Sequence, residues 1–152
     1  NDIEQVSSLF NQHGSDIACV ILEPSSIEHP KDNFLHKVKK LCTKYGAVFI
    51  LDEMITGFRW HLQGAQKYYE IEADLVTYGK AMANGFSVAA VAGKREIMSL
   101  GSIENEGSER LFLLSTTHGA EMCGLGAFIE TMKFMKKNDY GQSILIIIMI
   151  SI

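Results

Sequence analysis

Hydrophobic residues in the first half of the chain are grouped into two short continuous runs, at residues 17–22 and 47–51. Both runs are rich in branched side chains, which is typical of strands buried in a parallel sheet. Between them, residues 34–46 carry apolar side chains three and four positions apart, as on one face of a helix. Gly46 suits the end of that helix, because glycine readily takes the left-handed conformation. The order strand, helix, strand predicts a βαβ unit with two parallel strands.

The same patterns predict the other elements of an α/β fold. We expect further helices at residues 2–11, 63–69, 94–100 and 120–137, and further strands at residues 74–78, 87–93 and 111–114. The segments between them are polar or contain glycine or proline, as loops usually do. The pattern therefore favours a mostly parallel sheet with helices on both faces.

Polar residues stand where the predicted strands end. Glu23 follows the first strand, Asp52 ends the second, and Lys80 follows the third. Ligands bind beyond the carboxyl ends of the strands in such sheets, so these positions are candidates for chemistry. Glu53 follows Asp52, and adjacent strand residues point to opposite faces, so we do not expect the two to form one acid pair.

Position alone leaves each candidate open. From its position, Asp52 is as typical of a turn or helix-cap residue as of a catalytic one. Glu23 is as typical of a structural carboxylate as of a residue near a ligand. A lysine such as Lys80 is more often a solvated surface residue. The alternative is a partly desolvated lysine, which loses its proton and forms a Schiff base.

The Gly79-Lys80 pair does not belong to a phosphate-binding P-loop. That motif has a glycine five residues before its Gly-Lys pair and Ser or Thr directly after it. Asp74 and Ala81 occupy those positions here. A dinucleotide-binding fingerprint is also excluded, because no GxGxxG pattern follows the first predicted strand.

Charge and cysteine content narrow the class of partner. The net charge is −4 and no extended basic patch occurs, which argues against nucleic acid and anionic membrane as partners. Three cysteines without CxxC spacing argue against a disulfide framework or a zinc site. Reduced thiols fit a cytoplasmic protein. The uncharged run 144–152 is about half as long as a membrane span.

Two blocks of the sequence resemble the signature of class III pyridoxal-phosphate aminotransferases. They are residues 49–59, FILDEMITGFR, and residues 74–85, DLVTYGKAMANG. Within that class they look most similar to glutamate-1-semialdehyde 2,1-aminomutase-like proteins. The resemblance runs over residues 2–138, and the two blocks and their spacing are specific.

The resemblance implies roles for three residues. Lys80 would form the internal aldimine with pyridoxal 5'-phosphate and, once freed, would move the α-proton of the substrate. Asp52 would pair with the pyridine nitrogen and keep the ring protonated, so that the ring withdraws electrons. Thr116 would contact the phosphate of the cofactor bound by a neighbouring subunit, which implies a homodimer acting on small-molecule amino donors and acceptors.

The sequence departs from the family pattern at two places near these residues. Met54 stands where the family usually has a smaller residue. Ala120-Glu121 replaces the usual continuation after Gly119, which puts the local geometry beside Thr116 in doubt.

The resemblance also implies a fold and a division of the chain. The fold is part of the large domain of fold-type I pyridoxal-phosphate transferases, plus the start of the small C-terminal domain. Residues 1–119 would form the second half of the cofactor-binding large domain, and residues 120–138 a long helix leading to the C-terminal domain. Residues 139–152 would form an atypical apolar tail. Two interpretations of the tail are a buried strand and a frameshifted or truncated terminus.

Three functions are compatible with these features. The first is amino-group transfer within glutamate 1-semialdehyde, as in the aminomutases. The second is intermolecular transamination of an amino-sugar or ω-amino substrate, because residues 60–66 differ from those typical of the aminomutases. The third is a catalytically incompetent fragment that acts only as a folding or interaction unit.

We predict that this chain by itself binds pyridoxal phosphate weakly and does not turn over. Members of the class have an upstream glycine-rich turn that holds the cofactor phosphate and an aromatic residue that stacks on the ring, and neither is found in these 152 residues. Titration of the purified chain with the cofactor, followed by its yellow absorbance, measures the affinity. Tight binding together with turnover would show the prediction to be wrong.

Overall fold

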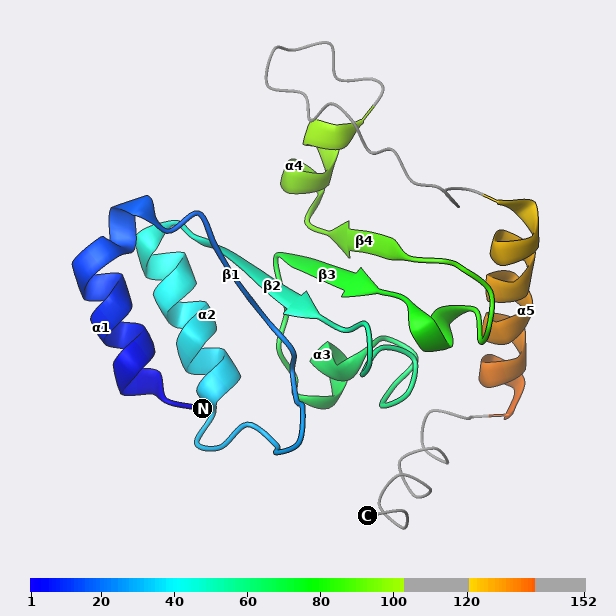
Figure 1. The fold of residues 1–152 in the computed structure, drawn as a ribbon, viewed down its shortest axis with the longest axis horizontal. Coiled ribbons are helices and arrows are strands. Elements are labelled where there is room, and N and C mark those ends of the chain that lie inside the picture. The colour runs from blue at the N-terminus through cyan, green and yellow to red at the C-terminus, as the bar shows by residue number, and fades with distance from the viewer. Residues whose placement is uncertain (103–120, 139–152) are drawn as a thin grey trace.

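The computed structural model of the chain describes residues 1–102 and 121–138 (Figure 1). The helices are α1 (Ile3–His13), α2 (Phe34–Tyr45), α3 (Ala65–Tyr68), α4 (Arg95–Met98) and α5 (Met122–Asn138). The strands are β1 (Cys19–Leu22), β2 (Val48–Asp52), β3 (Leu75–Tyr78) and β4 (Ala90–Gly93). Single 3₁₀ turns follow α1, β3 and α4, at Gly14–Asp16, Lys80–Met82 and Ser99–Gly101.

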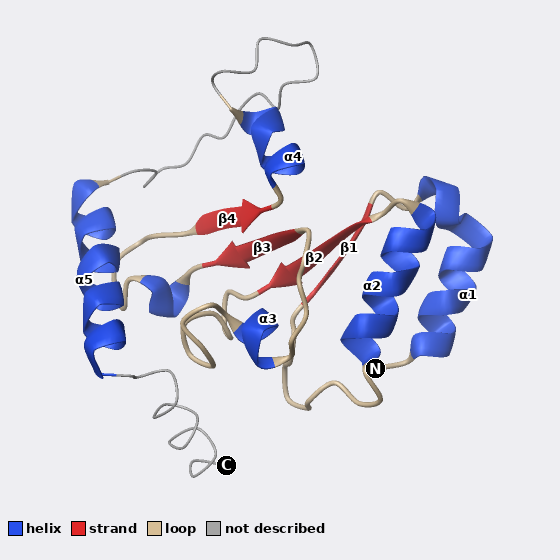
Figure 2. Ribbon diagram, turned by 180° about the vertical axis from the view of Figure 1, so that it is seen from behind, coloured by secondary structure: helices blue, strands red, loops and turns tan. Residues whose placement is uncertain are grey.

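The four strands form one sheet in the order β1-β2-β3-β4 (Figure 2). The pairs β1–β2 and β2–β3 are parallel, and β4 runs antiparallel to β3. The predicted βαβ unit is thus confirmed as β1-α2-β2, within a mostly parallel α/β sheet. Gly46 ends α2 at φ +75° and donates its backbone N–H to the carbonyl of Cys42, which confirms the predicted helix end.

The main core lies between α1, α2 and one face of the sheet. Phe10 from α1, Val38 from α2, and Phe49 and Leu51 from β2 are almost fully buried there. Alternate residues of β2 point to opposite faces, so Val48, Ile50 and Asp52 lie on the other side and are half-buried. This alternation sends Asp52 away from the apolar core.

The expectation that residues 17–22 form a strand buried on both sides is wrong within the described part. Ile21 of β1 is 56% exposed, because β1 is the edge strand there and the main core covers only one of its faces. Two other predicted elements are shorter than expected: the strand at 87–93 begins at Ala90, and the helix at 94–100 is α4 followed by a 3₁₀ turn. The strand predicted at 111–114 and the tail 139–152 lie outside the described residues.

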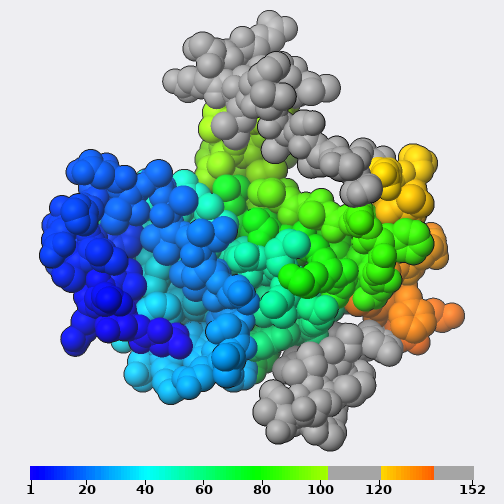
Figure 3. Space-filling model, in the orientation of Figure 1, coloured from blue at the N-terminus to red at the C-terminus, as the bar shows by residue number. Residues whose placement is uncertain are grey.

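A second, smaller core joins α5 to the segment that follows β3. Phe58, Ala81, Met82 and Met135 are buried together in it. Figure 3 shows α5 (yellow to orange) beside the green segment that follows β3. The close approach depends on Gly124, where an added Cβ would lie 2.6 Å from Val88 Cγ2. No helix within residues 1–102 and 121–138 is long and apolar enough to cross a membrane.

Asp74 ties three strands together at the amino-terminal end of β3. Its Oδ2 accepts the backbone N–H of Phe49 at 2.8 Å, and its Oδ1 pairs with Lys94 Nζ at 2.6 Å. Burial raises the pKa of the Asp74 carboxyl. The hydrogen bonds from Lys94 and Phe49 and the nearby positive charges outweigh burial, so the net pKa lies below its usual value.

We expect the Asp74 carboxylate to make folding stability depend on pH in the acid range. Its pKa is lower in the folded than in the unfolded chain, so its contribution is fully present above the unfolded value of about 3.9 and is lost as pH falls through the folded value. Asp74→Ala should cost about 1–3 kcal/mol at pH 7, because the Phe49 N–H loses its acceptor inside the core. Urea unfolding between pH 7 and pH 3 measures this. A variant whose loss is the same at both ends of that range would contradict it.

Candidate functional site

Asp52 ends β2 and is held by two hydrogen bonds to one of its oxygens. Its Oδ1 accepts the backbone N–H of Met54 at 3.0 Å and the Thr77 hydroxyl, also at 3.0 Å. The second contact follows from the sheet, because Asp52 is the register partner of Thr77 in the parallel β2–β3 pair. Among the described residues, Oδ2 has no hydrogen-bond partner, so one acceptor of a fixed carboxylate is available.

Lys80 begins the turn that follows β3, three residues after Thr77. The turn is closed by hydrogen bonds from the Met82 N–H to the Gly79 carbonyl, at 2.9 Å, and from Ala83 and Asn84 to the Lys80 carbonyl. Ala81 and Met82 are buried and anchor the backbone, while the Lys80 side chain is exposed. The candidate lysine therefore extends from a fixed backbone at the same edge of the sheet as Asp52.

The backbone at Lys80 is in an unusual conformation. Its φ is +40°, in the left-handed region that non-glycine residues rarely adopt. Such a residue costs on the order of 1–3 kcal/mol and persists only where its surroundings enforce it, most often at functional sites. The buried neighbours in the second core provide that constraint.

Gly79, immediately before the lysine, is covered by Met54. A Cβ added to Gly79 would lie 2.9 Å from Met54 Sδ, and closer still to its terminal methyl group. The half-buried Met54 side chain thus occupies space that only a glycine leaves free. The larger residue at position 54 is accommodated locally in this way.

Glu53 points to the opposite side of the sheet from Asp52, as expected, and is fully buried. Its Oε2 accepts the backbone N–H of Ala65 and the Thr56 hydroxyl, and its Oε1 accepts the N–H of Gln66 at 2.9 Å. Burial raises the pKa of the Glu53 carboxyl, and these three hydrogen bonds oppose the rise. The sequence did not predict this role. The one signal is Gly64, where a Cβ would lie 2.6 Å from both carboxylate oxygens.

The remaining residues considered from the sequence are Glu23, His61 and Thr116. Glu23 is exposed after β1, and His61 accepts the N–H of Gln63 through its Nδ1. Thr116 lies outside the described residues. No cluster of His, Cys, Asp and Glu within the described ranges has the arrangement of a metal site.

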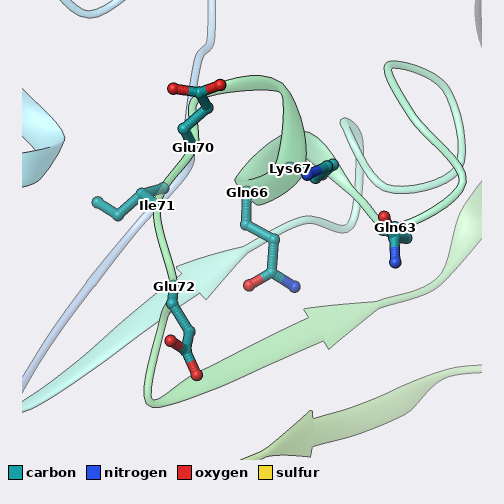
Figure 4. Close-up of a pocket in the computed structure, with 6 residues that line it drawn as sticks. All are labelled: Gln63, Gln66, Lys67, Glu70, Ile71 and Glu72. Carbon is teal, nitrogen blue, oxygen red and sulfur yellow. The ribbon is translucent and has the colours of Figure 1, made fainter.

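An open cleft of about 480 Å³ lies beside α3 (Figure 4). It is lined by Gln63, Gln66, Lys67, Glu70, Ile71 and Glu72. These side chains come from α3 and the segments next to it, and neither Asp52 nor Lys80 is among them. The cleft is therefore separate from the candidate site.

Glutamate-1-semialdehyde 2,1-aminomutases are similar in sequence to this chain over most of its length. The chain is 52% identical over 102 residues to a glutamate-1-semialdehyde 2,1-aminomutase of Alkaliphilus oremlandii, which covers 64% of this chain and 24% of that protein. It is 40% identical over 143 residues to the enzyme of the same name from Thermosipho africanus, covering 91% of this chain and 32% of that protein. The chain thus spans a quarter to a third of the length of these relatives.

Solved structures with the same fold include transaminases. One, described as a transaminase with PLP bound, matches with a TM-score of 0.79 and 27% identity, over 89% of this chain and 32% of that one. An ω-transaminase from Sphaerobacter thermophilus matches with a TM-score of 0.79 and 28% identity, over 88% of this chain and 31% of that one. The predicted α/β fold, part of the fold-type I transferase large domain, is confirmed by these similarities.

A family model described as aminotransferase class-III matches residues 1–147. The match spans both sequence blocks and every helix and strand described above. The chain belongs to the class III aminotransferase family.

Proposed function

We propose that this chain supplies the lysine and the ring-nitrogen partner for pyridoxal-phosphate-dependent amino-group transfer. The observation that carries the proposal is the β2–β3 pairing, which brings Asp52 and the turn of Lys80 to one edge of the sheet. Class III membership and similarity to a transaminase with PLP bound support the same cofactor.

The residues present fit this cofactor. Asp52 has one oxygen fixed by Met54 and Thr77 and a second oxygen without a partner in the described part, which suits a single N–H donor such as a ring nitrogen. When bound, the cofactor supplies an aldehyde for a lysine amine and an electron-withdrawing ring. Asp52 would hold the proton on the ring nitrogen through Oδ2.

Lys80 would act through its Nζ atom. The hydrogen bonds of the turn fix the Lys80 backbone, and its side chain is exposed. As a free amine, Nζ would take a proton from the carbon that carries the amino group of the substrate and return it to the carbon on the other side of the amino nitrogen. Thr116 would bind the cofactor phosphate of a neighbouring subunit in a homodimer. The protein would act in the cytoplasm.

Among the reactions of the class, we favour the aminomutase type. Two relatives, 52% identical to this chain over 102 residues and 40% identical over 143 residues, are named glutamate-1-semialdehyde 2,1-aminomutases. Intermolecular transamination is the alternative, supported by the transaminases of the same fold and by the unusual segment at 60–66. A catalytically incompetent fragment is the third possibility, because the chain spans only part of its relatives.

The division of the chain into a cofactor-domain part (residues 1–119), a connecting helix (120–138) and an apolar tail (139–152) stays a prediction.

We expect borohydride to trap the cofactor on Lys80 in preference to other lysines. Reduction makes even a weak, reversible adduct permanent, so peptide mass spectrometry can count labelled sites at high cofactor concentration. Lys67, which is exposed on α3 away from the site, serves as the internal control. Asp52→Asn should reduce labelling of Lys80 about tenfold, because a hydrogen bond to a charged group is lost, and leave Lys67 unchanged. Equal labelling of both lysines in the unaltered chain would refute the assignment.

The substrate can be identified in a full-length enzyme that contains this segment. With glutamate 1-semialdehyde alone, we expect product to form without any added keto acid, because an aminomutase returns the amino group to the same carbon skeleton. Product analysis by chromatography, with and without a keto-acid acceptor, measures this. Strict dependence on the acceptor would instead identify an intermolecular transaminase, and activity in neither case would favour the incompetent fragment.

A further inference from the structure

Glu53 is a fully buried carboxylate that the proposed chemistry does not use. It stands next to Asp52 in the chain but faces the other side of the sheet. Its oxygens take the backbone N–H groups of Ala65 and Gln66, twelve and thirteen residues further along. One side chain therefore closes the loop 54–64 on itself and fixes the start of α3.

The contacts continue from α3 to the strand that carries the lysine. Gln66 Nε2 donates to the Tyr78 hydroxyl at 3.0 Å, and Tyr78 is the last residue of β3, two before Lys80. Burial raises the pKa of Tyr78, and the charge of Glu53 raises it further. Glu53 and Tyr78 are thus coupled both through Gln66 and electrostatically.

Backbone contacts also join Glu53 to the end of β3 and to loop 54–64. Glu53 donates its N–H to the Thr77 carbonyl at 3.0 Å, and its own carbonyl accepts the N–H of Gly57 at 2.9 Å. A Cβ added to Gly57 would lie 2.7 Å from both the Glu53 carbonyl oxygen and the Tyr78 ring. Loop 54–64 is therefore packed directly against the end of β3 at Gly57, where the Tyr78 ring leaves no space for a side chain.

We propose that Glu53 is a positioning residue that holds the turn of Lys80 in its productive place relative to Asp52, acting through Gln66 and Tyr78. The inference rests on the proposed function, because it assigns Glu53 to the same site. A carboxylate is required: it offers two acceptors to two backbone donors and the Thr56 hydroxyl. The amide of glutamine would present an N–H to one of those donors.

Hydrogen exchange of this chain without cofactor tests the coupling. In Glu53→Gln we expect the amides of Met82 and Ala83, which close the turn of Lys80, to exchange about tenfold faster than in the unaltered chain. Asp74→Asn is the matched control, because Asp74 is also a carboxylate that accepts a backbone N–H of β2, but at the opposite end of β3. It should leave these two amides unchanged.

A spectroscopic readout separates positioning from a purely structural role. In a full-length enzyme that contains this segment, with pyridoxal phosphate on Lys80, the midpoint pH of the cofactor's absorbance change reports the surroundings of Nζ. We expect Glu53→Gln and Tyr78→Phe to move this midpoint in the same direction, and Asp74→Asn to leave it in place. Tyr78→Phe keeps the ring that packs on Phe58 and removes only the hydroxyl, so it decides the question if Glu53→Gln does not fold.

The possible failures are distinguishable. If Lys80 takes up no cofactor in a full-length enzyme that contains this segment, the proposed function fails and the positioning role fails with it. If Lys80 is labelled but Tyr78→Phe and every folded Glu53 variant keep the original midpoint, the proposed function stands and the positioning role is refuted. The same holds if Asp74→Asn shifts the midpoint as much as Glu53→Gln does.

Discussion

The parallel pairing of β2 with β3 sets Asp52 opposite Thr77, and the geometry of the site follows from that register. The carboxyl ends of parallel strands lie at the same end of the sheet, so Asp52 at the end of β2 and Lys80 just after β3 come to that end although 28 positions separate them. The Thr77 hydroxyl bonds to Asp52 Oδ1 across the pair, which fixes the carboxylate. A shift of β3 by one residue would turn Thr77 to the other face and remove this contact.

The alternation of side chains along β2 separates two tasks that would conflict if they shared one environment. Phe49 and Leu51 point into the main core, and Glu53 continues on that side as a buried carboxylate satisfied by backbone N–H groups. Asp52 points the other way, into a half-buried position where Oδ2 has no hydrogen-bond partner among residues 1–102 and 121–138. The adjacent acids therefore have different surroundings: one holds a loop in place, and the other faces the edge where a ligand binds in sheets of this type.

Local patterns were sufficient to predict most of the fold. The β1-α2-β2 unit, the glycine that ends α2 and the position of Asp52 at a strand end all depend on residues close in sequence. The role of Glu53 could not be predicted in this way, because its donors at Ala65 and Gln66 become neighbours only after loop 54–64 has folded. The positive φ of Lys80 was missed for a related reason: it is enforced by the packing of Ala81 and Met82 with α5, some fifty residues further along. The exposure of β1 was missed because periodicity does not show which strand lies at the edge of a sheet.

The two outer strands of the described sheet, β1 and β4, each have one unpaired side among the described residues. Ile21 on β1 is 56% exposed and Val91 on β4 is 52% exposed, and neither strand has a second neighbour among the described residues. Unpaired edges with apolar side chains favour pairing with further strands, and the chain spans only a quarter to a third of its relatives. Asp52 ends β2 and Lys80 follows β3, and β2 and β3 are the two central strands of the described sheet, so neither residue lies on an edge strand. A pocket around them depends on what lies beyond the edge strands, because Asp52 and the Lys80 turn supply one side of a binding site, and the affinity for a cofactor comes from enclosing it on several sides.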